Sequence, residues 1–520
     1  MASNLPTEPN PSTPQAVGAG LTTVTGVQLM QGLGVQPAKG FWADAWQSVM
    51  TRSRARVAMI WLGLIALISI LAPFIANGHP LFYTLTAADG STQQSFPLFL
   101  NLKPSDVLLA VGFIASVAYW ITARKYSRGM RLATILVVGL GGMLMVAASA
   151  GIFAYLRSAD GFTIARDGVQ TSIVVALRGE GGLLLRFGFA FLACIIPAVL
   201  LYFVLPQTKA IVRIVLAAAT LATCSSVSAG LWERPLQNYD YREQIAAGKA
   251  TAVFTLIPFS PNQRDVRGSI VPPGTSLGQT RNTPVEEPPI PGKPIYVLGT
   301  DSNGQDVLSQ MLHACRLSIS IGLISTGIAV MIGVTMGALM GYFGGWVDLL
   351  LYRVVEIFMA LPVLFLLIVA AAVLPKSTYV MMVVIGCVSW TGAARFTRAE
   401  FMRLRNMDFV QAAKSVGLPL HSILFRHMLP NGVTPVLVDS SFAIASAILA
   451  EATLSYLGLG PEDQASWGKL LSDSTGNVGT ILWWLAIFPG LAIFLTVLSY
   501  NLLGESLRDA IDPKLKKARV

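Results

Sequence analysis

FVQAAKSVGLPLHSILFRHMLPN, residues 409–431, lies in an Arg-rich loop between two long apolar segments. It contains the residues of two short helices. The first has good helix formers, with Asp408 placed as an N-cap and Gly417 as the residue that ends the helix. Pro419 suits the first turn of the second helix, which we expect to run until Pro430. The segment therefore predicts a helix–turn–helix loop.

The side chains of this loop predict contact with another protein. Ala412 and Ala413 make the first helix thin, and small side chains let a helix enter a groove. Several apolar residues of the loop need a partner: Phe409, Leu420, Leu424 and Phe425. The same pattern also suits an ordinary amphipathic loop, and the two interpretations stay open at this point.

Composition places the loop in a membrane protein. The 520-residue chain is 53% hydrophobic and only 12% charged, which is about half the charged fraction of ordinary soluble domains. The net charge of +10 comes from Lys and Arg that lie mostly beside apolar spans. This distribution follows the positive-inside rule and predicts contact with membrane lipid rather than with nucleic acid.

Ten apolar segments have the composition of membrane spans, for which a bilayer core needs about 20 residues. We expect them at 57–76, 107–122, 133–156, 187–205, 211–232, 317–341, 354–374, 378–394, 436–457 and 481–503. The predicted fold is all-α and polytopic, with both termini cytoplasmic. Residues 41–50 form a candidate interfacial helix, and Pro362 is a candidate kink.

The spans group into five regions. We expect a cytoplasmic N-terminal tail at 1–50, a first span within 51–77, and an insert at 78–294 with four spans and extracytoplasmic loops. A core of five spans follows at 295–505 and includes the 409–431 loop, and 506–520 forms a cytoplasmic tail. Residues 1–40 are rich in Pro, Ser, Thr and Gly, a composition that predicts disorder.

Small residues recur every four positions in the span 317–341, at Ala329, Gly333, Gly337 and Gly341. They predict a smooth helix face for close packing. The preceding segment, 296–316, predicts an interfacial helix capped by Asp301 or Ser302. The sequence GYFGGWVD, residues 341–348, predicts a tight cytoplasmic turn.

Three acidic residues lie in or at the ends of predicted spans, where charge is costly, and are candidate pathway residues: Glu356, Asp439 and Glu451. A structural role near the outer end is the favoured alternative for Glu451, and Asp439 lies near the inner end, within reach of water. The four Cys and four His are scattered, without metal-ligand spacing, so we expect no metal site. No catalytic motif and no G-x-x-x-x-G-K-[ST] phosphate loop is present, so ATP cannot be held by that route.

The 409–431 loop resembles the EAA loop of ATP-binding cassette importer permeases. Positions of that pattern are filled by Gln411, Ala412, Ala413, Gly417, Leu429 and Pro430. Four further stretches resemble the C-type permease of oligopeptide and dipeptide importers: LGTDSNGQDVLSQML at 298–312, GYFGGWVD, ILAEATLSYLGLG at 448–460 with SWG at 466–468, and NLLGESLRDAIDP at 501–513. The resemblance covers 41–76 and 296–513. Departures are Gln411 in place of Glu, Gln305 and Gln310 where Arg is common, His427 at an apolar position, and the insert.

The resemblance implies a type I importer permease that has no catalytic residues. It implies pairing with a second related permease, two cytoplasmic ATPases that hold ATP and Mg²⁺, and an extracytoplasmic solute-binding protein. It also implies that ATPase coupling lies with Gln411, Ala412, Ala413, Gly417, Leu420, Leu424, Phe425, Arg426 and Pro430. Peptides are the expected cargo, although relatives in this class also carry nickel, glutathione or sugars.

Two other functions compete with this one. An ion-coupled secondary transporter would use Glu356 and Asp439 as ion sites and would transport alone. A membrane scaffold would be built on the insert and would not need Gly417. Co-purifying ATPases would separate the importer from both alternatives.

Overall fold

The computed structural model describes residues 41–511, except 87–91, 103, 125, 127, 159–162, 167–168, 173–181, 206–209, 231–240, 266–267, 281–292, 462–463, 476–481 and some side chains. The predicted disordered tail at 1–40 and the last residues of the C-terminal tail lie outside this range. The described chain is mostly helical, which confirms the all-α prediction.

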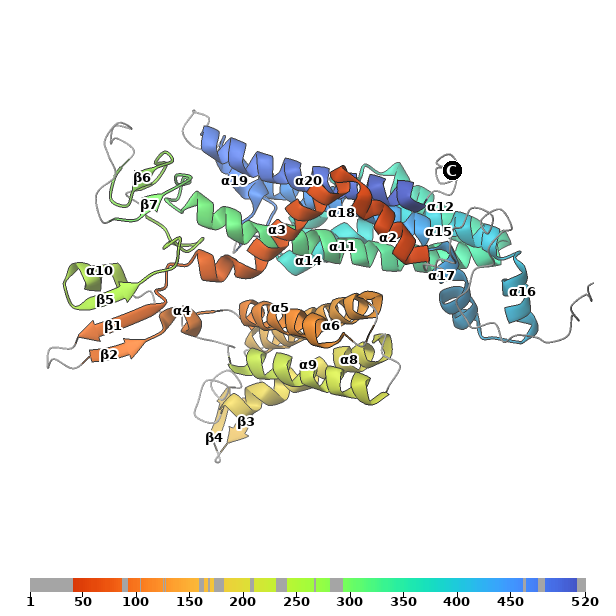
Figure 1. Ribbon diagram of the computed structural model, residues 1–520, viewed down its shortest axis with the longest axis horizontal. Coiled ribbons are helices and arrows are strands. Elements are labelled where there is room, and N and C mark those ends of the chain that lie inside the picture. Colours follow the sequence, from red (N-terminus) through yellow and green to blue (C-terminus); the bar gives the residue numbers. More distant parts are fainter. Residues whose placement is uncertain are drawn as a thin grey trace, which may run out of the picture.

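The permease core is built from long apolar helices that lie side by side (Figure 1). Four are continuous: α3 (Ser53–Ile75), α11 (Val307–Phe343), α18 (Thr434–Tyr456) and α20 (Trp483–Ile511). Two further pairs are bent, α12 (Gly345–Ala360) with α13 (Val363–Val373) by 83°, and α14 (Thr378–Val388) with α15 (Thr391–Leu404) by 41°. Proline lacks an N–H and cannot continue the first of these pairs, so the kink predicted at Pro362 is confirmed.

The insert forms a second bundle beside the core (Figure 1). Its helices are α5 (Pro104–Thr122), α6 (Arg128–Ser158), α8 (Gly182–Val204) and α9 (Ala210–Gly230). Their shared interior is apolar and is made by Met145, Cys194, Ala198, Leu201, Leu205 and Cys224. Because this interior is separate from that of the core, the insert packs as a unit of its own.

Most of the short strands gather at one end of the molecule, called the strand end below, and α16 lies at the other (Figure 1). An antiparallel sheet of order β2-β1-β5 joins β1 (Phe82–Thr86), β2 (Thr92–Ser95) and β5 (Ala250–Val253). Two smaller sheets pair β3 (Thr163–Arg166) with β4 (Val169–Ser172), and β6 (Thr275–Ser276) with β7 (Ile295–Tyr296). Strands β3 and β4 lie apart from the other strands, beneath the insert bundle (Figure 1). The short helices are α2 (Phe41–Thr51), α4 (Pro97–Leu100), α10 (Tyr241–Ala246) and α19 (Trp467–Asp473).

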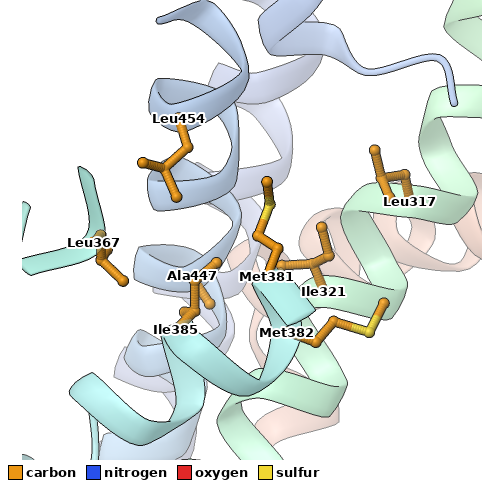
Figure 2. Packing of buried hydrophobic residues seen from close by; sticks show 8 residues of the cluster. All are labelled: Leu317, Ile321, Leu367, Met381, Met382, Ile385, Ala447 and Leu454. Carbon is orange, nitrogen blue, oxygen red and sulfur yellow. The ribbon is translucent and has the colours of Figure 1, made fainter. Parts of the chain in front are cut away.

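The core helices are joined by interlocking apolar side chains. Figure 2 shows one cluster that takes residues from α11, α13, α14 and α18: Leu317, Ile321, Leu367, Met381, Met382, Ile385, Ala447 and Leu454. Two methionines fill the irregular space between the branched side chains, as flexible thioethers do in many cores. This cluster therefore packs α11, α13, α14 and α18 together.

Each of the ten predicted spans corresponds to a helix or a bent helix pair. Seven helices are long and apolar enough to cross a membrane, the two bent pairs raise this to as many as nine, and α5 is a shorter apolar helix. The predicted positions therefore correspond to described helices, although α11, with 37 residues, is much longer than the span predicted at 317–341. The number of helices within a bilayer stays a prediction.

The helix predicted within 296–316 to lead into a span is present, because α11 begins at Val307 and continues into the span, but its predicted cap is wrong. Its N-cap is Asp306, whose side chain accepts a bond from the Ser309 N–H, rather than Asp301 or Ser302. The tight turn predicted in 341–348 is confirmed: Gly344, with a φ of 64°, ends α11, and α12 begins at the next residue. The predicted C-terminal tail also begins inside a helix, since α20 runs to Ile511.

Candidate functional site: the segment between α15 and α18

The loop predicted at 409–431 lies at the end of the bundle opposite the strand end (Figure 1). It consists of α16 (Asp408–Ser415), the π-helix η1 (Ser422–Met428) and α17 (Leu429–Gly432). We call 408–432 the coupling segment. It connects the core helices α15 and α18 directly, so a displacement of the segment must move at least one of them.

The turn of the coupling segment is made by Gly417. Its φ is 75°, in the left-handed region that glycine adopts without a Cβ penalty. Its N–H donates to the Lys414 carbonyl at 2.9 Å, and the Leu418 N–H donates to the Ala413 carbonyl at 3.2 Å. The structure therefore has a glycine-ended first helix at the predicted place.

Two boundary predictions need correction. Asp408 is the first residue of α16 rather than its N-cap, which is Met407, and no side chain caps this helix. The second helix does not stop at Pro430 but continues as α17 to Gly432. Proline lacks an N–H and crowds the carbonyl four residues earlier; the wider π turn, with Leu429 N–H donating to Leu424 O, accommodates Pro430 without ending the helix.

One face of the coupling segment is buried against the core. Its inward residues pack on α11 and α15 in one cluster: Val410, Ala413, Ile423, Leu424 and Met428 with Ala338, Phe401 and Leu404. The prediction that Ala412 and Ala413 both face a partner is therefore wrong for Ala413, and Leu424 is likewise an interior residue. Consecutive helical residues point about 100° apart, so two adjacent alanines cannot share one face.

The opposite face of the coupling segment is exposed and partly apolar. It carries many of the predicted coupling residues: Gln411, Ala412, Gly417, Leu420, Phe425, Arg426 and Pro430. It also carries Val416, which is 78% exposed and which the sequence reasoning missed. The available signal was its place directly before Gly417, where a helix ends and its last side chain projects outward.

Polar contacts tie the coupling segment and α15 to the core. The Lys414 ammonium lies 4.9 Å from the centroid of the Tyr342 ring at the end of α11. Gln411 donates through its side-chain amide to the Arg405 carbonyl at 3.0 Å. In α15, Arg398 binds Asp348 of α12 with both branches of its guanidinium, one of them at 2.7 Å. Such forked pairs fix orientation as well as distance.

The small-residue face of α11 lies against α15. A Cβ built on Gly337 would lie 2.4 Å from the Ala394 carbonyl oxygen, and one on Gly333 would lie 2.6 Å from that of Trp390. On Gly341 it would lie 2.5 Å from the Phe401 Cβ. Ala329 is buried on the same helix, beside Trp390 and Ala394. These approaches are closer than side chains permit, so only glycine allows this helix contact.

The three acidic residues predicted as candidate pathway groups are not brought together. Glu356 is exposed and pairs with Arg353 one turn away on α12. Asp439 lies beside Gly392 of α15, with Arg395 as an attracting charge. Glu451 is fully buried, and its Oε1 accepts bonds of 2.7 Å from the hydroxyls of Ser455 and Ser466. Glu451 thus joins α18 to the start of α19.

At the strand end, α11 begins in a cluster of buried carboxylates. Burial raises the pKa of Asp306 to about 7, and the nearby charge of Asp301 adds to the rise. Burial also raises the pKa of Asp301, which accepts bonds from the Gln305 N–H and the Gln310 amide at 2.8 Å. Among the described residues, no group of three or more His, Cys, Asp or Glu has the arrangement of a metal site.

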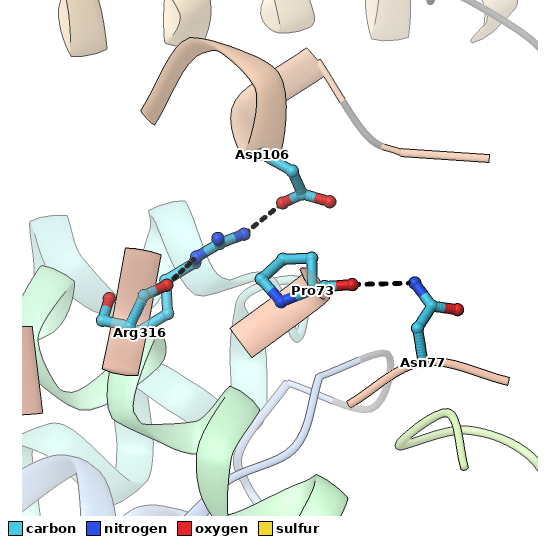
Figure 3. Close-up of polar contacts among 5 residues, drawn as sticks. Pro73, Asn77, Asp106 and Arg316 are labelled. Atoms are coloured by element: carbon cyan, nitrogen blue, oxygen red, sulfur yellow. Dashed lines mark hydrogen bonds and ion pairs between the residues drawn. The ribbon is translucent and has the colours of Figure 1, made fainter. Parts of the chain in front are cut away.

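A polar joint at the same end connects the insert to the core (Figure 3). Arg316 of α11 forms an ion pair with Asp106 of α5 and donates through Nε to the Ser69 carbonyl of α3 at 3.2 Å. Pro73 has no N–H to donate to that carbonyl, so Arg316 replaces the missing helical bond. Asn77 donates to the Pro73 carbonyl at 3.1 Å. We call Arg316, Asp106 and Ser69 the three-helix joint.

The fold and the coupling segment together define an all-α, multi-pass membrane permease with an exposed helical loop at one end. Comparison with protein families agrees. The chain matches "Binding-protein-dependent transport system inner membrane component" over residues 333–517 and "N-terminal TM domain of oligopeptide transport permease C" over 40–104.

Individual relatives match over about half of the chain. The dipeptide transport system permease protein DppC of Alkalihalophilus pseudofirmus is 37% identical over 42% of this chain and 72% of its own length. The glutathione transport system permease protein GsiD of Pectobacterium atrosepticum is 39% identical over 42% of this chain and 73% of its own length. DppC of Haemophilus influenzae is 35% identical over 50% of this chain and 84% of its own length. A solved structure of the MetNI methionine ABC transporter in an inward-facing conformation matches with a TM-score of 0.32 and 14% identity, over 39% of this chain and 97% of that one.

The chain belongs to the family of binding-protein-dependent transport system inner membrane components, in the oligopeptide and dipeptide permease class. It is a transmembrane permease subunit of an ATP-binding cassette importer and a multi-pass inner-membrane protein. The family as a whole works with ATPase and solute-binding partners.

Proposed function

We propose that this chain forms one half of a permease pair that imports short peptides, with a second, related permease as the other half. Two cytoplasmic ATPase subunits would hold ATP and Mg²⁺, and an extracytoplasmic protein would deliver the solute. The chain itself would carry no catalytic residue and no cofactor. The coupling segment and both termini would lie in the cytoplasm.

The exposed face of the coupling segment carries this proposal. Val416, Leu420 and Phe425 are apolar and stand in the solvent of the isolated chain, although the buried face of the same segment is well packed. An apolar helical ridge of this kind fits a groove on a partner protein. Arg426 beside Phe425 adds a positive charge for an acidic edge of the groove.

The way the coupling segment is attached supports a mechanical role. Its inner face packs on α11 and α15, and α15 contacts α11 at glycine positions that leave no space for sliding. A pull on the coupling segment therefore reaches α11 as a rigid displacement. ATP-driven closure of the partner ATPases would use this route to favour one of two permease states.

The cargo assignment rests on the relatives. Their names give dipeptides, oligopeptides and glutathione as the transported solutes, and all three contain peptide bonds. We infer a short peptide for this chain as well. The ion-coupled alternative has less support, because its two proposed ion sites, Glu356 and Asp439, lie on different helices and Glu356 is paired with Arg353.

Purification of the assembled complex from its native membrane tests both parts. We expect two ATPase chains and a second permease to co-purify, and ATP-dependent uptake of a labelled dipeptide by proteoliposomes that also contain the solute-binding protein. Uptake that proceeds without ATP in a proton gradient would reject the importer mechanism. Uptake of another solute in place of peptides would reject only the cargo.

A matched pair of variants tests the coupling segment. Val416→Asp places a charge on the proposed contact face and should abolish ATPase co-purification, while the chain still inserts. Val297→Asp makes the same change at an exposed apolar residue near the strand end and should leave ATPase binding intact. Equal ATPase binding by the two variants would contradict the proposed contact.

A further inference from the structure

An apolar patch lies at one end of one face of the strand-end sheet, and the rest of that face carries polar residues such as Thr84 and Thr86. The patch consists of Phe82, Phe96, Phe99, Val253 and Leu256, which are between 47% and 86% exposed. Phe82 lies opposite Val253 in the β1–β5 ladder, and the rings of Phe82 and Phe96 meet edge to face at 5.2 Å. We call these five residues the Phe99 patch.

The other face of the same sheet is already covered. Tyr83, which alternates with Phe82 along β1, is buried with Ala250 of β5 and Tyr241 of α10. Side chains of a strand point alternately to its two faces. The sheet therefore has one packed side. The Phe99 patch forms one end of the other side and is exposed to a large extent among the described residues.

The depth of the Phe99 patch follows from α3. From Val57, where its apolar run begins, to Ile75 the helix is about 28 Å long at ~1.5 Å per residue, close to the ~30 Å of a bilayer core. Ile75 thus lies at the core boundary. The Ile257 N–H donates to the Ile75 carbonyl at 2.9 Å, and Leu256, which is 86% exposed, is the next residue along the chain.

A second attachment gives the same depth. Helix α5 has 19 residues and also spans about 28 Å, so its first turn lies at the core boundary as well. Helix α4, which carries Phe99, ends at Leu100, four residues before α5 begins at Pro104. At ~3.5 Å per step, this connection reaches about 14 Å at most. In Figure 1, α4 lies directly beside the strand-end terminus of α5.

We propose that the Phe99 patch is a lipid-contact surface that lies in the headgroup and upper acyl region of the leaflet at the strand end. Aromatic side chains are favoured at this depth, where one side is apolar and the other is wet. Helix α5, which follows α4 in the chain, also carries exposed apolar residues, among them Ile114 and Ile121. The Phe99 patch holds the sheet against the membrane and leaves the rest of the strand end for soluble partners.

Photo-cross-linking in the assembled complex tests this proposal. Phe99→p-benzoylphenylalanine and Phe82→p-benzoylphenylalanine change the side chain little at exposed positions. The matched control is Thr92→p-benzoylphenylalanine, at an exposed polar residue of β2. It lies on the same face of the sheet but opposite Thr86, four residues along β1 from Phe82 and away from the patch. After illumination of native membranes, we expect phospholipid adducts at positions 99 and 82 and no phospholipid adduct at position 92.

Three results would overturn the proposal. The first is a protein adduct at position 99, which would show that the solute-binding protein or the second permease covers the patch. The second is a lipid adduct at position 92 with the same yield as at position 99. The third is the absence of any adduct at position 99. A nitroxide at position 99 in nanodiscs gives an independent readout. It should collide more with oxygen than with a water-soluble nickel chelate, and the opposite order would also reject lipid contact.

Discussion

Replacing Gly337 by alanine tests whether α11 and α15 form one mechanical unit. The new Cβ would lie 2.4 Å from the Ala394 carbonyl oxygen and 2.6 Å from the Thr397 Cβ. Two of the nearest atoms belong to backbone or to a side-chain root, so they cannot rotate away, and the helix axes must separate by several tenths of an ångström. Overpacking of this kind costs about 1–3 kcal/mol.

Gly327→Ala is the matched control because it adds the same methyl group to the same helix. Apart from the neighbouring backbone of α11 itself, no described atom lies within 4 Å of the Cβ that this change would add. The control should be neutral or stabilising by up to ~1 kcal/mol, since alanine is the better helix former. The two variants thus differ in packing alone.

Unfolding in mixed SDS micelles, followed by tryptophan fluorescence, measures the difference. We expect the unfolding equilibrium of Gly337→Ala to shift toward the unfolded state by about 5- to 150-fold, which corresponds to the 1–3 kcal/mol above. Peptide uptake per ATP hydrolysed should also fall, because α15 leads into the coupling segment. If Gly337→Ala proved as stable as Gly327→Ala, the close contact of the two helices would be refuted.

Three further outcomes follow from the structure. Gly417→Ala should weaken ATPase binding about 5- to 30-fold, because alanine at this left-handed position costs ~1–2 kcal/mol of backbone strain. Gly417→Asn should weaken ATPase binding less. Pull-down titration of the ATPase measures both affinities. The pKa of Asp306 is raised from 3.8 to about 7, so between these pH values the folded chain binds more protons than the unfolded chain. The free energy of unfolding should therefore fall as pH rises from about 4 to about 7 and stay level above it. Asp306→Asn should flatten this pH dependence in the SDS unfolding assay. Asp106→Ala should destabilise by about 3–5 kcal/mol, as expected when one partner of a buried ion pair is removed, and adding Arg316→Met should restore part of this loss in the same assay.

The spans could be predicted from sequence because bilayer thickness and helix rise fix their length. The kink at Pro362 was also predictable, since proline has no N–H. The break before α15 was not, because its two residues, Ser389 and Trp390, are neither proline nor glycine. There Trp390 packs edge to face on Phe358 at 5.5 Å while its carbonyl approaches Gly333. That break is set by contacts between distant parts of the chain, which no local pattern contains.

In the coupling segment, the turn was predictable and the orientation was not. Gly417 alone fits a left-handed position at a helix end, so a short motif locates the turn. Which side of an eight-residue helix faces inward depends on Ala338 and Phe401, which belong to other helices. For this reason the pattern assigned Ala413 to the partner, although it belongs to the interior.

The three-helix joint shows why the insert is more than an addition to the core. A charge within an apolar helix needs a counter-charge, so Arg316 predicts an acidic partner, but the sequence offers several. The structure assigns Glu356 to Arg353 and Glu451 to two serines, whereas Arg316 pairs with Asp106 of the insert. A core helix thus depends on the insert for neutrality, and removal of the insert would leave the Arg316 charge without its carboxylate at membrane depth.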